Sequence, residues 1–310
     1  MSITKNGTYT APLGSAYNPV NVDVQEEPWA PLQDGYSNFW FELTNDTLSP
    51  WLNFSAKNAN ATIDWGDGSG EQSLDTLTPT HTYSKSGRYI VKVKGVTGIG
   101  RQHSTPYTDV TVNYNTVLKN VELNSEVTTL SANSFWNCVK LEQIVGGNIS
   151  SLGSGSFSYD ASMKKINLTG NFTEWTDSCA YNFCLTEITF PQTVQSIIAN
   201  SFASCLSLQE ITIPASVTSI GNNAFSSSYS LVEIHCLSTT PPTIGTYVFN
   251  GLPTDFIIYV PVGYGDTYKS ATGWSTYADH IVEEGQTPNR AMLSSAGPRE
   301  DDEKPDDNER

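Results

Sequence analysis

The sequence predicts a mainly β protein, in which a small β-sandwich is followed by a solenoid of stacked repeats. Residues 36–97 contain several short strand-like runs with turn signals between them, as in a small antiparallel sandwich. Residues 118–230 repeat with a period of 22 or 23 residues, which is typical of a solenoid. Charged residues make up 15% of the chain, so Ser, Thr and Asn supply much of the polarity, as in extracellular β modules.

Length and charge limit the classes of function. The 310 residues suggest two domains. The net charge is −16 and there is no basic cluster, which argues against binding to nucleic acid or to an anionic membrane. No apolar run approaches the ~20 residues of a membrane span, so we expect no membrane insertion. The first residues lack both a basic and an apolar segment, so we expect no signal peptide.

We expect no catalytic residues, no cofactor and no metal site. The four histidines share no local spacing, and neither H-E-x-x-H nor G-x-S-x-G occurs. The run GDGSG at 66–70 lacks the Lys-Ser/Thr ending of a phosphate-binding loop. The cysteines form no C-x-x-C pair, which argues against a zinc ribbon. The odd number of cysteines also argues against a fully paired disulfide framework, and we expect small, buried, apolar side chains at Cys138, Cys179, Cys184, Cys205 and Cys236.

The two ends of the chain differ from the rest. Residues 1–25 predict a short extended arm, in which valines alternate with polar residues as in a strand. Residues 26–35 predict a linker, because prolines interrupt any regular element. Residues 283–310 are rich in charge and contain no aromatic residue, which predicts an acidic disordered tail.

A turn motif marks the first predicted module. Residues 64–69 read Asp-Trp-Gly-Asp-Gly-Ser, and His81-Thr82-Tyr83 and Gly87-x-Tyr89 follow. Together these residues resemble a PKD-type immunoglobulin-like domain, which implies a β-sandwich over 36–97 and a junction or capping segment over 98–117.

Two interpretations of the motif's polar side chains remain open. In the first, Asp67 hydrogen-bonds its own loop and His81 is structural. In the second, Asp64 and Asp67 bind calcium, although two carboxylates supply fewer oxygens than the six to eight that this ion takes.

The repeats carry two sequence markers in phase. Strand-like runs begin at residues 118, 141, 163, 185, 208 and 231, and their first, fourth and sixth positions are apolar, so we expect these side chains to point into the stack. The second marker predicts a buried ladder, in which the smaller Cys179 leaves a gap or draws in Tyr181 or Phe183. The marker residues are Phe135, Phe157, Cys179, Phe202 and Phe225.

Residues 185–230 match a longer pattern, L-x-x-I-x-I-P-x-x-V-x-x-I-x-x-x-A-F-x-x-C. The matching positions include Pro191, Pro214, Val194, Val217, Ile197, Ile220, Phe202, Phe225 and Cys205. This pattern resembles the BspA-like leucine-rich repeat. The resemblance implies five repeats over 118–230, closed by a C-terminal cap over 231–282.

Two surfaces are candidate binding sites. The third strand position places Glu187, Glu210 and Glu233 in one column after Lys165, either as a solvated face or as a site for a cation or a cationic group. Aromatic residues also recur just after the second marker, and such a stripe suits sugar rings or protein anchors, or packs within the solenoid. The residues of the stripe are Trp136, Tyr159, Tyr181 and Tyr229.

These resemblances imply adhesion, without enzymatic activity. BspA-like repeats are typical of bacterial surface proteins that bind host matrix or other cells. Residues 3–22 resemble an N-terminal module of phage tail and prophage proteins, which implies attachment of the arm to other virion proteins. The leading hypothesis is therefore a virion accessory, on a tail or head fibre, and the alternative is a bacterial cell-surface adhesin. In both, the partner is a carbohydrate or a protein on a cell surface.

Overall fold

The computed structural model describes residues 35–44, 49, 50, 52–102, 117–176 and 179–288. The predicted arm at 1–25, most of the linker, and the tail from residue 289 lie outside this part of the chain. The start of the predicted tail is ordered, because strand β18 (Ile281–Glu283) reaches into it and Glu284 forms an ion pair with His235 at 2.7 Å.

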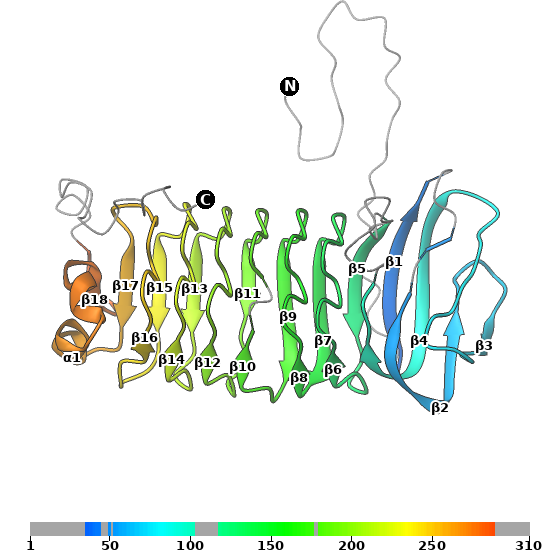
Figure 1. Cartoon of the computed structure of the whole chain (residues 1–310), viewed down its shortest axis with the longest axis horizontal. Coiled ribbons are helices and arrows are strands. Elements are labelled where there is room, and N and C mark those ends of the chain that lie inside the picture. The colour runs from blue at the N-terminus through cyan, green and yellow to red at the C-terminus, as the bar shows by residue number, and fades with distance from the viewer. Residues whose placement is uncertain (1–34, 45–48, 51, 103–116, 177–178, 289–310) are drawn as a thin grey trace, which may run out of the picture. The chain divides into compact units, whose positions relative to one another are not determined.

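The first four strands form one antiparallel sheet in the order β1-β4-β2-β3. Their bounds are β1 (Ser37–Leu43), β2 (Phe54–Asp64), β3 (Glu71–Ser73) and β4 (Gly87–Ile99). On its other side β1 pairs antiparallel with β5 (Leu118–Leu123), the first strand of the repeats, so the sheet continues into the solenoid (Figure 1). A separate PKD-like sandwich of two sheets is therefore not confirmed.

The long strands of the repeats lie side by side in parallel, one per turn (Figure 1). β5, β7 (Gln143–Ile149), β9 (Lys165–Gly170) and β11 (Glu187–Thr189) extend the first sheet. β13 (Glu210–Ile213), β15 (Glu233–Cys236), β17 (Ile257–Val260) and β18 form a second sheet. The apolar positions point inward as expected. Leu118, Val121 and Leu123 are buried in the first of these strands, and Leu208, Ile211 and Ile213 in the fifth repeat.

Two-residue strands form a second row across the core. They are β6 (Thr129–Leu130), β8 (Ser151–Leu152), β10 (Glu174–Trp175), β12 (Ser196–Ile197), β14 (Ser219–Ile220) and β16 (Thr243–Ile244). β10 to β16 pair in parallel, and β6 pairs with both β8 and the end of β4. The long strand β4 thus contributes to both rows, which joins the N-terminal sheet firmly to the first turns.

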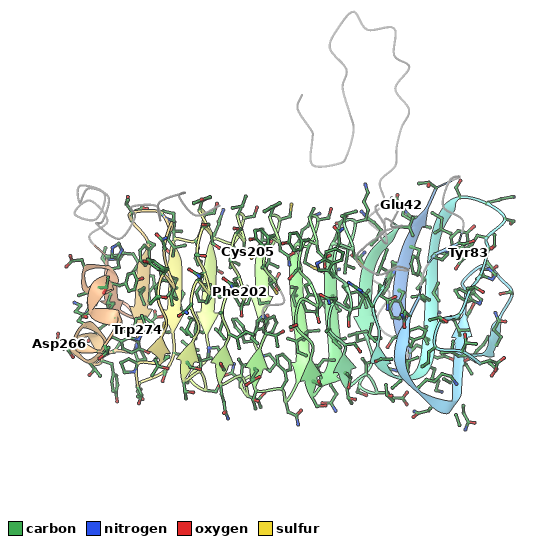
Figure 2. The ribbon with its side chains drawn as sticks, viewed as in Figure 1. Glu42, Tyr83, Phe202, Cys205, Asp266 and Trp274 are labelled. Atoms are coloured by element: carbon green, nitrogen blue, oxygen red, sulfur yellow. The ribbon has the colours of Figure 1, made fainter. Side chains whose placement is uncertain are left out.

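The predicted ladder of aromatic rings is buried between the two rows of strands. Phe135 stacks on Phe157 with ring centroids 5.9 Å apart, and Phe202 stacks on Phe225 at 5.5 Å (Figure 2 labels Phe202). Phe249 extends the ladder by one more turn. The expectation for Cys179 was wrong in one respect. Trp175, buried and parallel to Phe202 at 5.8 Å, fills the space, whereas Tyr181 and Phe183 are exposed.

A second ladder is made of short polar side chains that accept main-chain hydrogen bonds from the preceding turn. The N–H of Cys138 donates to Asp160 Oδ1 at 2.6 Å, and the N–H of Asp160 donates to Asn182 Oδ1 at 3.0 Å. The N–H of Cys205 likewise donates to Ser228 Oγ at 3.2 Å. Because these residues are all buried, the ladder satisfies main-chain donors that water does not reach.

The cap begins later than the sequence indicated. Residues 231–256 form another turn, with strands β15 and β16 and the ladder residue Phe249. The cap itself consists of α1 (Gly265–Ser270), the 3-10 helix η1 (Trp274–His280) and β18. Trp274 is buried there, and its indole N–H donates to the carbonyl of Pro242 at 2.7 Å, which fastens the cap to the last turn (Figure 2).

No disulfide joins the five cysteines, and four of them are buried as expected. Burial raises the pKa of the Cys205 and Cys236 thiols to about 12, so both remain neutral at physiological pH. Cys184 is exposed, which the sequence did not predict.

Candidate functional site

One side of the solenoid is built from turns rather than strands, and we call this surface the turn face. It comprises residues 131–138, 153–161, 179–184, 198–207, 221–230 and 245–251. Two positions, four residues apart, lie in the left-handed region of backbone space in most of these turns, and the second of them has φ between 58° and 73°. We call the residues at this second position the turn column: Asn137, Tyr159, Tyr181, Ser204, Ser227 and Gly251.

Main-chain hydrogen bonds between turns explain this conformation. The N–H of Tyr159 donates to the carbonyl of Ala180 at 3.2 Å, and the N–H of Tyr181 donates to that of Ala203 at 2.9 Å. The N–H of Ser204 makes the corresponding bond to Ser226 at 2.9 Å. Since the stack fixes the direction of these N–H groups, each residue of the turn column adopts a positive φ whatever its side chain.

Tyrosine is an unfavourable residue for such a position. Gly and Asn adopt a positive φ at low cost, whereas a bulky side chain there carries backbone strain of about 1–3 kcal/mol. Tyr159 and Tyr181 nevertheless adopt φ of 65° and 63°. Their rings are 47% and 42% exposed, so burial in the core does not offset the strain. Residues held in strained backbone conformations cluster at functional sites.

The predicted aromatic stripe exists in part. The rings of Tyr159 and Tyr181 stack with centroids 4.8 Å apart and planes 16° from parallel. Trp136 meets Tyr159 in a T-shaped arrangement at 6.0 Å, and the guanidinium of Arg101 lies 5.8 Å from the Trp136 ring. Tyr229, 63% exposed, does not join this stack, because it lies two turns farther along and beside Gly251.

The acidic column on the opposite, strand-bearing face is different from the uniform column that the sequence suggested. Glu187 forms an ion pair with its neighbour Lys165 at 2.5 Å. Glu210 and Glu233 are directly paired on β13 and β15, but Glu187 belongs to the other sheet. Glu187 lies on the turn before Glu210, so the three glutamates occupy consecutive turns, and Glu187 is paired with Lys165.

Further charged side chains gather on the same strand-bearing face. Glu142 accepts hydrogen bonds from Lys119 at 2.5 Å and from Lys164 at 2.8 Å. Burial alone raises the pKa of Glu142, but the hydrogen bonds and positive charge of the two lysines outweigh it, so the net pKa is lower than usual. This face is a network of mixed charge, while the turn face has only the buried Asp160 among its described charged residues.

The turn at residues 64–69 of the N-terminal sheet is stabilised by hydrogen bonds between its own side chains and main chain. Asp64 Oδ1 accepts from the N–H of Gly66 at 2.9 Å, and Asp67 Oδ1 accepts from the N–H of Ser69 at 3.0 Å. Hydrogen bonds from Ser69, and secondarily from His81 to Asp67 Oδ2 at 2.8 Å, lower the pKa of Asp67 to about 2. The first interpretation, a self-bonded loop, is therefore the one that these contacts support.

His81 is part of an aromatic cluster. Its ring stacks on Trp65 at 4.8 Å and meets Tyr83 at 4.6 Å, and the Tyr83 hydroxyl donates to the carbonyl of Trp65 at 2.7 Å. Within the described ranges, no group of three or more His, Cys, Asp or Glu side chains has the arrangement of a metal site. No helix in the same ranges is long and apolar enough to cross a membrane.

Comparison with known proteins identifies the repeats. The BspA type leucine rich repeat region matches in six copies, over residues 111–205 and 173–256. Residues 111–256, a little under half of the chain, are therefore similar to BspA-type leucine-rich repeats, and we call them the BspA-type region. The six copies exceed the five that the sequence predicted, in agreement with the additional turn at 231–256. No curated protein matches the chain.

Several solved structures resemble part of the chain. A leucine-rich repeat protein from Bacteroides ovatus is 26% identical, covers 49% of this chain and 39% of its own, and has a TM-score of 0.41. A leucine rich cell surface protein from Faecalibacterium prausnitzii is 21% identical, with coverages of 67% and 55% and a TM-score of 0.36. The leucine-rich repeat protein of T. pallidum is 18% identical, with coverages of 52% and 78% and a TM-score of 0.36. The chain thus spans about two fifths of the length of the B. ovatus protein.

Two exposed aromatic residues of the BspA-type region were missed as site candidates. Phe183 is 45% exposed beside the tyrosine stack, and Tyr247 is 54% exposed with φ 55°. From the sequence, Phe183 was considered only as one of two residues that could fill the gap left by Cys179. The sequence pattern does contain a signal for Phe183: it lies two residues after the turn-column residue of its turn, as Tyr229 does in its own turn.

Proposed function

We propose that the chain is a non-enzymatic adhesin of the BspA type that acts at a bacterial cell surface and binds its ligand through the turn face. The observation that carries this proposal is the stacked pair of exposed tyrosines, held at a positive φ on consecutive turns. The BspA-type repeats support the class of protein, since such repeats are typical of surface proteins that bind host matrix or other cells.

The rigidity of the stack supports a binding role for these rings. An exposed aromatic ring contributes most to binding when it is already ordered, because little side-chain entropy is then lost. Each tyrosine here is fixed by its neighbour and by main-chain hydrogen bonds between turns. Aromatic residues on a preformed surface are also the usual energetic centres of interfaces.

The alternative binding face is the pair Glu210 and Glu233. It is a weaker candidate, because the strand-bearing face as a whole is not uniformly acidic. Lysines of that face form ion pairs with the nearby acids Glu142 and Glu187. The virion hypothesis rested on residues 3–22, which lie outside the described residues, and the comparisons favour the bacterial adhesin. The absence of enzymatic activity is part of the proposal.

The test uses a double variant designed from the chain itself. Tyr159→Asn and Tyr181→Ser introduce residue types that the turn column already holds at Asn137 and Ser204 with similar φ, so the variant should fold. Binding of the full chain to cultured epithelial cells is measured at low and high salt. We expect the double variant to lose binding and the unmodified chain to show little salt dependence.

The matched control is Glu210→Gln with Glu233→Gln, which should bind as the unmodified chain does. Strong salt dependence, together with normal binding by the tyrosine variant and loss of binding by the glutamine variant, would move the site to the strand-bearing face. Normal binding by both variants would refute the proposal for the repeats altogether.

A further inference from the structure

The aromatic part of the turn column ends abruptly at Tyr181. On one side, the ring of Tyr181 is covered by Tyr159, with centroids 4.8 Å apart. On the other side lies the turn that carries Ala203 and Ser204, to which Tyr181 is joined by its main-chain N–H. The next residues of the column, Ser204, Ser227 and Gly251, are all small.

The outer ring face of Tyr181 therefore adjoins small side chains. Because the two stacked rings are nearly parallel, the outer face is directed along the column, toward Ser204. Phe183, two residues farther on, adds a second exposed ring from the same turn. Neighbouring turns are ~4.8 Å apart, the distance between paired strands. The turns after Tyr181 have only small residues in the turn column, so the surface should be lower beside the ring. We call this place the step at Tyr181.

The polar groups around this step are neutral. The turn that follows Tyr181 supplies the exposed amide of Asn200 and the hydroxyl of Ser204, and the next turn supplies Asn222 and Asn223. No exposed charged residue occurs among the described residues of the turn face, although the chain carries a net charge of −16. Among the described turn-face residues around the step, a cationic or anionic ligand would find no exposed complementary charge, whereas a ligand with hydroxyl groups would find both donors and acceptors.

We propose that the step at Tyr181 binds a neutral carbohydrate, with the C–H face of one sugar ring stacked on the outer face of Tyr181. This proposal rests on the proposed function and names the class of its ligand. Aromatic rings combine apolar area with low entropic cost, and a few amides and hydroxyls nearby fix the orientation of the ligand. A polymeric glycan that runs along the turns would also reach Tyr229, and two weak contacts on one chain reinforce each other.

The direct test measures equilibrium binding of the full chain to neutral and charged polysaccharides. The neutral probes are mannan, xylan, starch and mixed-linkage β-glucan, and the charged probes are heparin and polygalacturonate. We expect saturable binding to at least one neutral probe, with little change between low and high salt. Binding to charged probes alone, or to none of the neutral probes, would overturn the proposal.

Three variants locate the site. Tyr181→Ser should lower the affinity about tenfold or more, and Ser204→Tyr, which places a ring against the outer face of Tyr181, should lower it as well. Tyr247→Ser is the matched control, because Tyr247 is also an exposed tyrosine at a positive φ but lies away from the stack. Full affinity in both Tyr181→Ser and Ser204→Tyr would contradict the assignment. Circular dichroism checks that each variant is folded.

A second measurement separates this proposal from the proposed function. Cells are treated with periodate, which cleaves the vicinal diols of sugars, or with protease before binding is measured. Loss of binding after periodate alone is expected. Loss after protease alone, together with loss in the Tyr159→Asn/Tyr181→Ser variant, would leave the turn face as an adhesive surface for a protein and refute the carbohydrate.

Discussion

Trp175 lies parallel to Phe202, with ring centroids 5.8 Å apart and an interplanar angle of 23°. The two residues come from different positions of the repeat. Trp175 is on the short strand β10, where the following turns have Ile197 and Ile220, and it takes up the space that a phenylalanine at position 179 would occupy. The large residue on one row of strands thus compensates for Cys179 in the aromatic ladder.

This compensation predicts a strong coupling between the two positions. Trp175→Leu should destabilise the protein by about 2–3 kcal/mol through a cavity, and Cys179→Phe by about 1–3 kcal/mol through overpacking. The double variant restores the usual pattern of the repeat, so its loss should be smaller than the sum by at least about 1 kcal/mol. Urea denaturation of the four proteins gives the coupling energy. Additive losses would mean that the two side chains do not share one space.

The aromatic ladder should contribute strongly to stability. Phe202 is fully buried between Trp175 and Phe225, so Phe202→Ala should cost roughly 3–5 kcal/mol. Chemical denaturation measures this loss, with the exposed Tyr247→Ala as the control expected to change stability far less. A loss below about 1 kcal/mol for Phe202→Ala would contradict a packed ladder.

Asp160 should make the protein less stable as the pH rises. Its side chain is fully buried, and burial raises the pKa of its carboxyl well above the ordinary value, while the hydrogen bond from Cys138 only partly opposes this. In the unfolded chain the carboxyl ionises near pH 3.9. Stability is therefore complete below that pH and falls as the pH rises above it toward the folded-state pKa.

Asp160→Asn removes this dependence. Asn182 occupies the same place one turn later and accepts the same main-chain hydrogen bond, so the amide fits the ladder. We expect the variant to be more stable at pH 7 by about 1–3 kcal/mol and to equal the unmodified protein near pH 3. Unfolding free energies across this range provide the measurement. An equal or lower stability of the variant at pH 7 would show that the carboxylate is tolerated in the core.

Asp67 should have the opposite pH dependence. Its pKa is lowered to about 2 by hydrogen bonds from Ser69 and His81, so its contribution is present above about pH 4 and is lost as the pH falls toward 2. Asp67→Asn keeps an acceptor for the Ser69 N–H but removes the charge. The variant should therefore be less stable than the unmodified protein at pH 7 and equal to it at pH 2. Identical pH profiles would contradict a role for this charge.

Much of the solenoid could be predicted from the sequence because each turn repeats the same physical requirement. An apolar residue at a fixed place in every 22 or 23 residues is a signal that many copies reinforce, and Leu118, Ile211 and Phe202 are buried as expected. The N-terminal segment offers no such repetition. Alternating residues such as those of β1 indicate a strand, but the pairing of β1 with β5 depends on which strand is available at the start of the solenoid.

The candidate site could be predicted only in outline. The spacing of Tyr159 and Tyr181 placed them on consecutive turns, and the structure stacks them. The sequence pattern placed Tyr229 in the same stripe as Tyr159 and Tyr181. Tyr229 lies two residues after the turn column, however, so its ring lies beside Gly251 and not in the stack. The positive φ of the column was not predicted, because it arises from hydrogen bonds between turns, and Tyr159 and Tyr181 are not residue types that favour it as Gly and Asn do.

The antiparallel pairing of β1 with β5 has a consequence for self-association. A stack of parallel strands offers an open edge at each end, which is a template for fibre growth by further copies. Here the reversed strand β1 covers the first such edge, and the outermost strand becomes β3, which has three residues, all exposed. At the far end, Glu283 of β18 accepts a hydrogen bond from the N–H of Gly265 at the start of α1. We therefore expect the described part of the chain not to polymerise end to end, which would leave its repeat surface available to other molecules.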